Sequence, residues 1–201
     1  QKKLSLVVVE DKIIFNNSIG DIIAVNATTG DIIWQTPTQD SSIYENSFLL
    51  QTSDLVADKS SILISNNKNE FFSISVKTGT INWQNKINSN VRPSVIDNLV
   101  FTVTIEGFLV VIDNSTGNII RITNIFDKLK KRKKSNTKPV GFIVGTNNIY
   151  LTTDNGLLII IEILSGRTSS ILKIDNEKIS RPFVLDKNLF IIKDNAIIKL
   201  N

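Results

Sequence analysis

Short hydrophobic runs alternate with polar turns along the whole chain, and one hairpin pattern recurs. The four hairpins read AVNATTGDIIW (24–34), SISVKTGTINW (73–83), VIDNSTGNIIR (111–121) and IEILSGRTSSI (161–171). Short runs rich in Ile, Val and Phe, bounded by Gly, Asn, Asp and Ser, are typical of β-strands joined by tight turns. The pattern therefore predicts an all-β protein that repeats one hairpin four times.

The turn glycine sets the register of this repeat. The four glycines are Gly30, Gly79, Gly117 and Gly166. Their spacings of 49, 38 and 49 residues suit a propeller blade, and glycine tolerates the positive φ of such turns. A small hydroxyl residue precedes each glycine: Thr29, Thr78, Thr116 and Ser165.

Two other positions of the repeat are also distinctive. Four residues before each glycine stands a polar side chain whose oxygen can accept hydrogen bonds from backbone N–H groups of the turn. These side chains belong to Asn26, Ser75, Asp113 and Glu162. Four residues after each glycine come Trp34, Trp83, Arg121 and Ser170.

Two further hydrophobic runs precede each hairpin, so each copy predicts four short antiparallel strands. Several runs are hydrophobic at consecutive positions, which suits strands that are buried on both faces. Four-stranded sheets repeated along a chain indicate a β-propeller. We expect one domain over residues 1–201, with a loop at 127–138 and blades at approximately 1–36, 37–87, 88–125, 137–175 and 176–201.

The last copy is shorter than the others. RPFVLDKNLFIIKDNAIIKLN (181–201) parallels RPSVIDNLVFTVTIEGFLVVID (92–113) and stops after the third strand. We expect about four complete blades and a three-stranded last blade, with 195–201 as an unpaired edge. The alternative is a closed ring of five blades, in which residues 1–10 would supply the missing strand.

The first hairpin resembles the A-x-D-x-x-T-G-K-x-x-W repeat of the PQQ-like β-propeller superfamily, with Asn26 for Asp and Asp31 for Lys. In that superfamily the tryptophan packs between adjacent blades. The resemblance implies this role for Trp34 and Trp83, whereas Arg121 and Ser170 depart from the pattern. It also implies an eight-bladed ring, of which this chain would be the C-terminal part.

The composition excludes much catalytic chemistry. The chain has no Cys and no His, so thiol nucleophiles, thiolate metal sites and histidine bases are excluded. The segments DNSTGN (113–118) and DNEK (175–178) lack the spaced carboxylates of a calcium loop. We predict no catalytic residue, no cofactor and no metal site.

The positive charge is concentrated in one loop. Of the 23 Lys and Arg residues, seven lie within 128–138, which leaves 16 against 19 Asp and Glu. A single basic loop is not a general nucleic-acid-binding surface. It is either a solvated insertion or a contact for anionic lipid, nucleic acid or an acidic partner. The contact residues would be Lys128, Lys130, Lys131, Arg132, Lys133 and Lys134.

The crowding of like charges also makes a structural prediction. Mutual repulsion should keep the segment from Lys130 to Asn136 extended and mobile. Pro139 should mark where the next strand begins.

Within the PQQ-like superfamily, the chain is similar in character to the BamB family of the outer-membrane barrel-assembly machinery. This resemblance implies a non-catalytic scaffold in the periplasm or at the outer membrane, which binds partner proteins through loops and strand edges. The alternative is a quinoprotein dehydrogenase that uses PQQ and calcium. That class typically carries an adjacent Cys pair, which this chain lacks.

Overall fold

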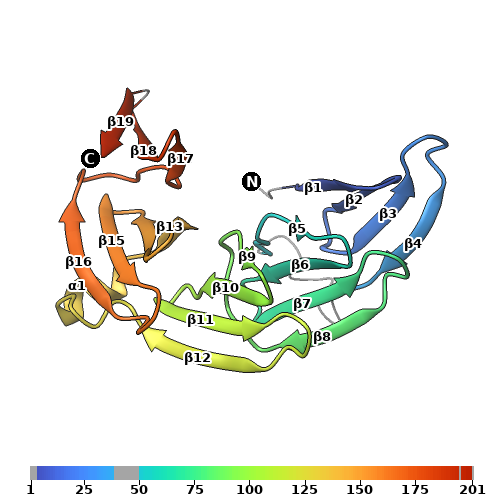
Figure 1. Cartoon of the computed structure of the whole chain (residues 1–201), viewed down its shortest axis with the longest axis horizontal. Coiled ribbons are helices and arrows are strands. Elements are labelled where there is room, and N and C mark those ends of the chain that lie inside the picture. Colours follow the sequence, from blue (N-terminus) through green and yellow to red (C-terminus); the bar gives the residue numbers. More distant parts are fainter. Residues whose placement is uncertain (1–3, 39–49, 195, 201) are drawn as a thin grey trace. The chain divides into compact units, whose positions relative to one another are not determined.

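The computed structural model describes residues 4–38, 50–194 and 196–200, and these residues form five antiparallel sheets (Figure 1). The first sheet contains β1 (Leu6–Val9), β2 (Lys12–Asn16), β3 (Ile22–Asn26) and β4 (Ile32–Thr36). The second contains β5 (Val56–Ala57), β6 (Ser61–Asn66), β7 (Glu70–Ser75) and β8 (Ile81–Asn85). The third contains β9 (Ser94–Ile96), β10 (Leu99–Val103), β11 (Phe108–Asp113) and β12 (Ile119–Asn124).

The remaining sheets follow a five-residue helix, α1 (Lys131–Ser135). The fourth sheet contains β13 (Pro139–Val144), β14 (Asn148–Thr153), β15 (Leu157–Glu162) and β16 (Thr168–Lys173). The fifth contains β17 (Phe183–Leu185), β18 (Asn188–Lys193) and β19 (Ala196–Leu200). In every sheet the strands lie in chain order, so hairpins connect them.

The sheets are propeller blades, four of four strands and one of three. The all-β propeller predicted from the sequence is confirmed, including the short last blade. The chain also divides into two compact units. One runs to Val100 and includes Ile112–Asn118, and the other contains Phe101–Val111 and continues from Ile119. The third sheet thus contributes to both units.

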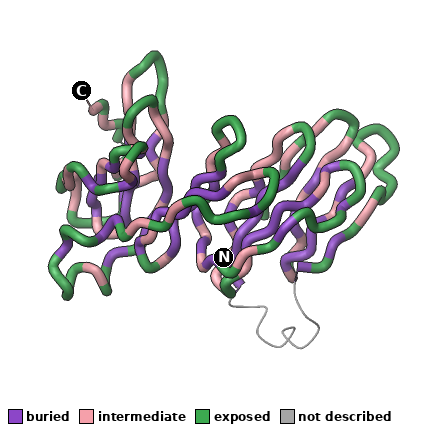
Figure 2. Tube along the Cα trace, turned by 60° about the horizontal axis from the view of Figure 1, so that its bottom comes forward, coloured by how far each residue is buried: buried purple, intermediate pink, exposed green. Residues whose placement is uncertain are grey.

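Burial follows the position of a strand in its sheet. All six residues of β6 are buried, as are the four central residues of β7 and of β11. The first strand, β1, alternates between exposed and partly buried residues. Figure 2 shows the same contrast between buried strands and exposed turns. Inner strands buried on both faces are expected when one sheet packs against another.

Two hydrophobic clusters show where neighbouring sheets meet. In the first, Ile14, Ile22 and Ala24 of the first sheet pack with residues of the second, among them Ile62 and Phe72. In the other, Leu158 of the fourth sheet packs with Ile179 and Ile191. The core therefore lies between sheets, as it must in stacked blades.

The outer strand of the last sheet is an edge. Within the described residues β19 pairs with β18 alone, and β1 pairs with β2 alone. Asn195 and Asn201, which bounded the expected edge, lie outside the described residues.

The prediction of an extended chain from Lys130 to Asn136 is wrong, because this segment contains α1. Backbone N–H groups of Lys133 and Lys134 donate to the carbonyl of Lys130. The hydroxyl of buried Thr137 donates to the carbonyl of Lys133 at 2.7 Å. These hydrogen bonds form despite the repulsion between side chains, which solvent weakens at an exposed site. The mobility of the segment stays a prediction, and β13 begins at Pro139 as expected.

Among the described residues, no helix has the length and hydrophobicity needed to cross a membrane.

Candidate interaction surface

Each repeat glycine lies in the hairpin between the third and fourth strands of its blade. The φ angles are 78° at Gly30, 72° at Gly79, 75° at Gly117 and 69° at Gly166. In all four hairpins the hydroxyl before the glycine accepts a hydrogen bond from the N–H after it, at 3.2–3.3 Å. The four turns therefore share one hydrogen-bonding pattern.

The polar residue four positions before the glycine also bonds to its turn. Asn26 Oδ1 accepts from the N–H groups of Thr28 and Thr29, at 2.8 and 3.0 Å. Ser75 Oγ accepts from the N–H of Thr78 at 3.3 Å. Glu162 differs because its side chain is longer: Oε2 accepts from the hydroxyl of Ser165 at 2.5 Å.

Asp113 makes the densest set of these bonds. Its Oδ1 accepts from the hydroxyl and the N–H of Ser115, at 2.6 and 3.0 Å, and from both groups of Thr116. The Ser115 hydroxyl contributes most, and together these donors lower the pKa of Asp113 to about 2. Donors aimed at a carboxylate favour its charged form. The folded turn therefore prefers ionised Asp113.

In the first three repeats the residue four positions after the glycine contacts the next blade, and we call this contact the blade latch. Trp34 Nε1 donates to the carbonyl of Val76 at 3.1 Å, and Trp83 Nε1 donates to that of Asn114 at 2.7 Å. Arg121 donates to the carbonyl of Ile163 at 2.6 Å and to that of Leu164. Val76, Asn114 and Ile163 all stand three residues before a repeat glycine, so the three latches are equivalent.

The latch also explains why the next turn needs glycine. A Cβ atom on Gly79 would lie 2.6 Å from Trp34 Cδ2, and one on Gly117 would lie 2.5 Å from Trp83 Cγ. On Gly166 it would lie 3.0 Å from Arg121 Nε. Gly30, which receives no latch, has nothing within 4 Å of such an atom. Three of the glycines thus serve a close contact in addition to positive φ.

The two tryptophans differ in burial. Trp83 is only 8% exposed, and its ring meets Phe71 edge to face with centroids 5.6 Å apart. Trp34 is partly exposed and packs on the cluster between the first two sheets. Ser170, the fourth residue of this set, lies in β16 opposite Ile160.

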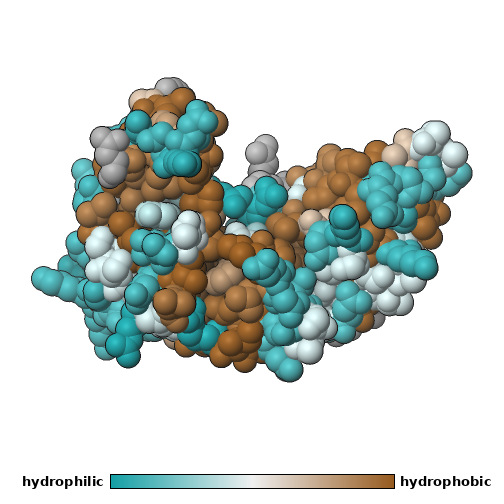
Figure 3. All heavy atoms as spheres, viewed as in Figure 1, coloured by the Kyte–Doolittle hydropathy of each residue, from teal (hydrophilic) through white to brown (hydrophobic). Residues whose placement is uncertain are grey.

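Isoleucines are exposed on the outer strands of the first three blades, and we call them the isoleucine rim. The rim consists of Ile32, Ile33, Ile81, Ile119, Ile120 and Ile122. In Figure 3 hydrophobic residues reach the surface along the lower rim of the view, where Figure 1 places β12. Sequence reasoning missed this feature. Its signal is the isoleucine that follows the turn glycine by two residues in three of the four hairpins.

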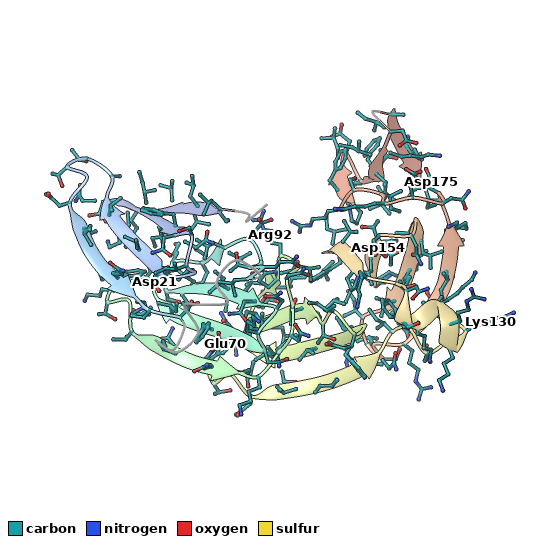
Figure 4. The ribbon with its side chains drawn as sticks, turned by 180° about the vertical axis from the view of Figure 1, so that it is seen from behind. Asp21, Glu70, Arg92, Lys130, Asp154 and Asp175 are labelled. Carbon is teal, nitrogen blue, oxygen red and sulfur yellow. The ribbon has the colours of Figure 1, made fainter. Side chains whose placement is uncertain are left out.

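The six basic residues singled out from the sequence lie on and beside α1, and we call them the basic cluster (Figure 4). Ile125, Phe126 and Leu129 beside them are buried, whereas Lys134 alone of the six is partly covered. Ion pairs join Lys12 to Asp11 and Lys193 to Asp175, and no ion pair of the described residues involves this cluster. The basic cluster can therefore attract an anionic partner.

The part of the chain that the structure describes contains no group of three or more His, Cys, Asp or Glu residues placed to hold a metal ion.

The hairpins, latches and blades define a β-propeller with PQQ-like repeats. Residues 2–123 match the family model described as outer membrane protein assembly factor BamB, and the chain belongs to this family. A search of curated proteins found no significant match.

Solved structures with low sequence identity share the fold. BamB from Moraxella catarrhalis is 14% identical with a TM-score of 0.63, and the match covers 96% of this chain and 70% of that one. The computationally designed Ika8 protein is 13% identical with a TM-score of 0.73, over 96% of this chain and 56% of that one. The Cps50 (Swd1) β-propeller domain of Myceliophteria thermophila is 9% identical with a TM-score of 0.71, over 95% and 62%.

Proposed function

We propose that the protein is a non-catalytic scaffold of the bacterial cell envelope that binds partner proteins during outer-membrane protein assembly. The observation that carries this proposal is the family match over residues 2–123. A periplasmic or outer-membrane-associated location is part of the same proposal. Stoichiometric binding of PQQ with calcium, with a raised melting temperature, would contradict it in favour of a quinoprotein dehydrogenase.

The isoleucine rim supports a role in protein binding. β12 is the last strand of its sheet, so its outer backbone groups have no neighbouring strand in that sheet. Ile120 and Ile122 on this strand are 57% and 56% exposed. An edge with free backbone groups and exposed hydrophobic side chains is suited to pair with an added strand. We propose β12 as the docking edge for a partner protein.

Site-specific photocrosslinking tests this function directly. A benzoylphenylalanine at Ile120 should form an adduct with a component of the outer-membrane assembly machinery in intact cells. The same group at Gln84, an exposed residue of β8, is the matched control and should give much less adduct. The proposal is contradicted by the absence of an adduct at Ile120, or by adducts that contain no envelope assembly component.

We also propose that the basic cluster contacts an anionic membrane surface. Replacing Lys130, Lys131, Arg132 and Lys133 with Ser should leave folding unchanged, because these side chains are exposed. Each basic residue near an anionic membrane contributes about 1 kcal/mol, so binding to phosphatidylglycerol vesicles should fall at least about tenfold. Binding by the unmodified protein should weaken with salt, since screening acts over about 8 Å at physiological ionic strength. Equal vesicle binding by both proteins at low salt would favour the solvated insertion.

A further inference from the structure

A polar pocket of about 580 Å³ lies between the turns of the second and third blades. Four serines and three asparagines line it, with no charged residue and no hydrophobic residue among them. Ser60 and Ser61 come from the second blade, as does Asn82 of β8. Asn98 and Asn114 come from turns of the third blade. The volume is within the range of small-molecule sites, but such sites are usually lined by hydrophobic groups.

At two positions of the repeat, the pocket has asparagine where other blades have hydrophobic residues. Asn82 follows its turn glycine by three residues, where the first and third blades have Ile33 and Ile120 and the fourth has Ser169. Asn114 stands three residues before its glycine, where the other blades have Ala27, Val76 and Ile163. Between the first two blades, Ile33 stands at the position of Asn82 and Val76 at the position of Asn114. Polar residues at these two positions are therefore not needed to join two blades.

Hydrogen bonds to two aspartates hold the side-chain amides of Asn98 and Asn114 in place. Asp58 Oδ2 accepts from Asn114 Nδ2 at 3.2 Å and from the hydroxyl of Ser61 at 3.0 Å. Asn98 Nδ2 donates to Asp113 Oδ2 at 3.0 Å. Since Asn114 gives its N–H to Asp58, its orientation is determined and Oδ1 is left as an acceptor. This Oδ1 is itself buried, so the side chain of Asn114 is held in place and does not turn its oxygen to solvent.

We infer that this pocket binds a neutral polyhydroxylated ligand, that is, a carbohydrate. Sugar hydroxyls both donate and accept, which matches a wall of serine hydroxyls and asparagine amides. The wall offers no charge to select an ion and no hydrophobic residue to receive an apolar side chain. This ligand is independent of the protein partner proposed for β12.

Ligand-observed NMR tests the inference with defined probes. The probes are maltotetraose, cellotetraose and chitotetraose, with tetra-alanine as the peptide comparison. At least one oligosaccharide should bind saturably, with a Kd on the order of 1 mM, and tetra-alanine should not. The N82I/N114V variant carries the residues that the chain itself uses between its first two blades, so it should fold. It should bind the same sugar at least about tenfold more weakly, as expected when hydrogen-bonding groups are removed.

Q84I is the matched control, because it adds an exposed isoleucine to the same strand outside the pocket. It should bind as the unmodified protein does, and circular dichroism should show that both variants are folded. The inference is overturned if no oligosaccharide of the panel binds, if tetra-alanine binds instead, or if N82I/N114V binds as well as Q84I.

Discussion

The latches of the first two blades use tryptophan, whereas the latch of the third uses arginine. Trp34, Trp83 and Arg121 all donate to a carbonyl three residues before the next repeat glycine. The two tryptophans also pass so close to that glycine that a Cβ atom would collide with them, and Arg121 Nε would lie 3.0 Å from a Cβ atom on Gly166. The repeat therefore retains a hydrogen-bond donor close to the glycine of the next blade, while the chemical nature of that donor changes.

The two kinds of latch do not have the same energetics. Trp83 buries a large apolar ring and satisfies its single N–H. Arg121 makes two hydrogen bonds to backbone carbonyls, but its Nε is buried and has no acceptor among the described residues. An unsatisfied buried donor is costly. The arginine latch is thus the weaker of the two and depends more on hydrogen bonding.

The largest expected effect comes from removing the buried ring. Trp83→Ala should lower the free energy of unfolding by ~3–5 kcal/mol through the cavity that it leaves. Trp83→Arg should lose less, because Arg121 shows that arginine can reach the equivalent carbonyl. Urea unfolding of both variants measures the difference. Equal losses would mean that the arginine latch contributes nothing beyond a truncated side chain.

Glycine substitutions separate the latch from the turn. Gly30→Ala adds a side chain into open space and should cost only the positive φ, about 1–2 kcal/mol. Gly79→Ala has nearly the same φ but must also displace the Trp34 ring, so its cost should be clearly larger. Thermal unfolding of the two variants compares them directly. If the latch contributes little to stability, the two variants should have nearly equal melting temperatures.

The smallest expected effect is a pH dependence that distinguishes the first and third turns. The pKa of Asp113 is about 2 in the folded chain against 3.8 for the free side chain, so folding favours the ionised form. The resulting stabilisation should be complete above about pH 4 and should be lost as the pH falls toward about 2. Asp113→Asn copies Asn26 of the first turn, which does not titrate. In urea unfolding this variant should show a smaller loss of stability over that pH range, and an unchanged profile would contradict the assignment.

Much of the fold could be predicted because the repeat depends on interactions between residues that are close in the sequence. Positive φ at the turn requires glycine, and a short polar side chain four residues earlier can reach the turn's N–H groups. These requirements hold within a few residues, so Gly30 and Asn26 are visible in the sequence. The consecutive hydrophobic positions of β6 and β11 likewise indicated burial on both faces.

The features that could not be predicted depend on distant residues or on a balance of forces. Arg121 departs from the tryptophan pattern, and only its hydrogen bond to the carbonyl of Ile163 shows that it forms the same contact with the next blade. Charge repulsion alone predicts an extended segment, but hydrogen bonds to the carbonyl of Lys130 and from the hydroxyl of Thr137 stabilise α1. The sequence does not show these hydrogen bonds. The polar pocket needs side chains from two blades, and no local pattern marks their meeting.

The blade latch has a consequence for how such a chain can lengthen or shorten. The second and third repeats carry both halves of the contact: a glycine that receives a side chain and, four residues later, a side chain that reaches the next blade. A duplicated copy of such a repeat would therefore bring a glycine that can receive the side chain of the preceding blade. It would also bring a side chain that can reach the glycine of the following blade. Because each repeat interacts mainly with its neighbours, stability is approximately a sum over successive junctions. A gene encoding such modules can gain or lose one of them by recombination, and the blades on either side can still join.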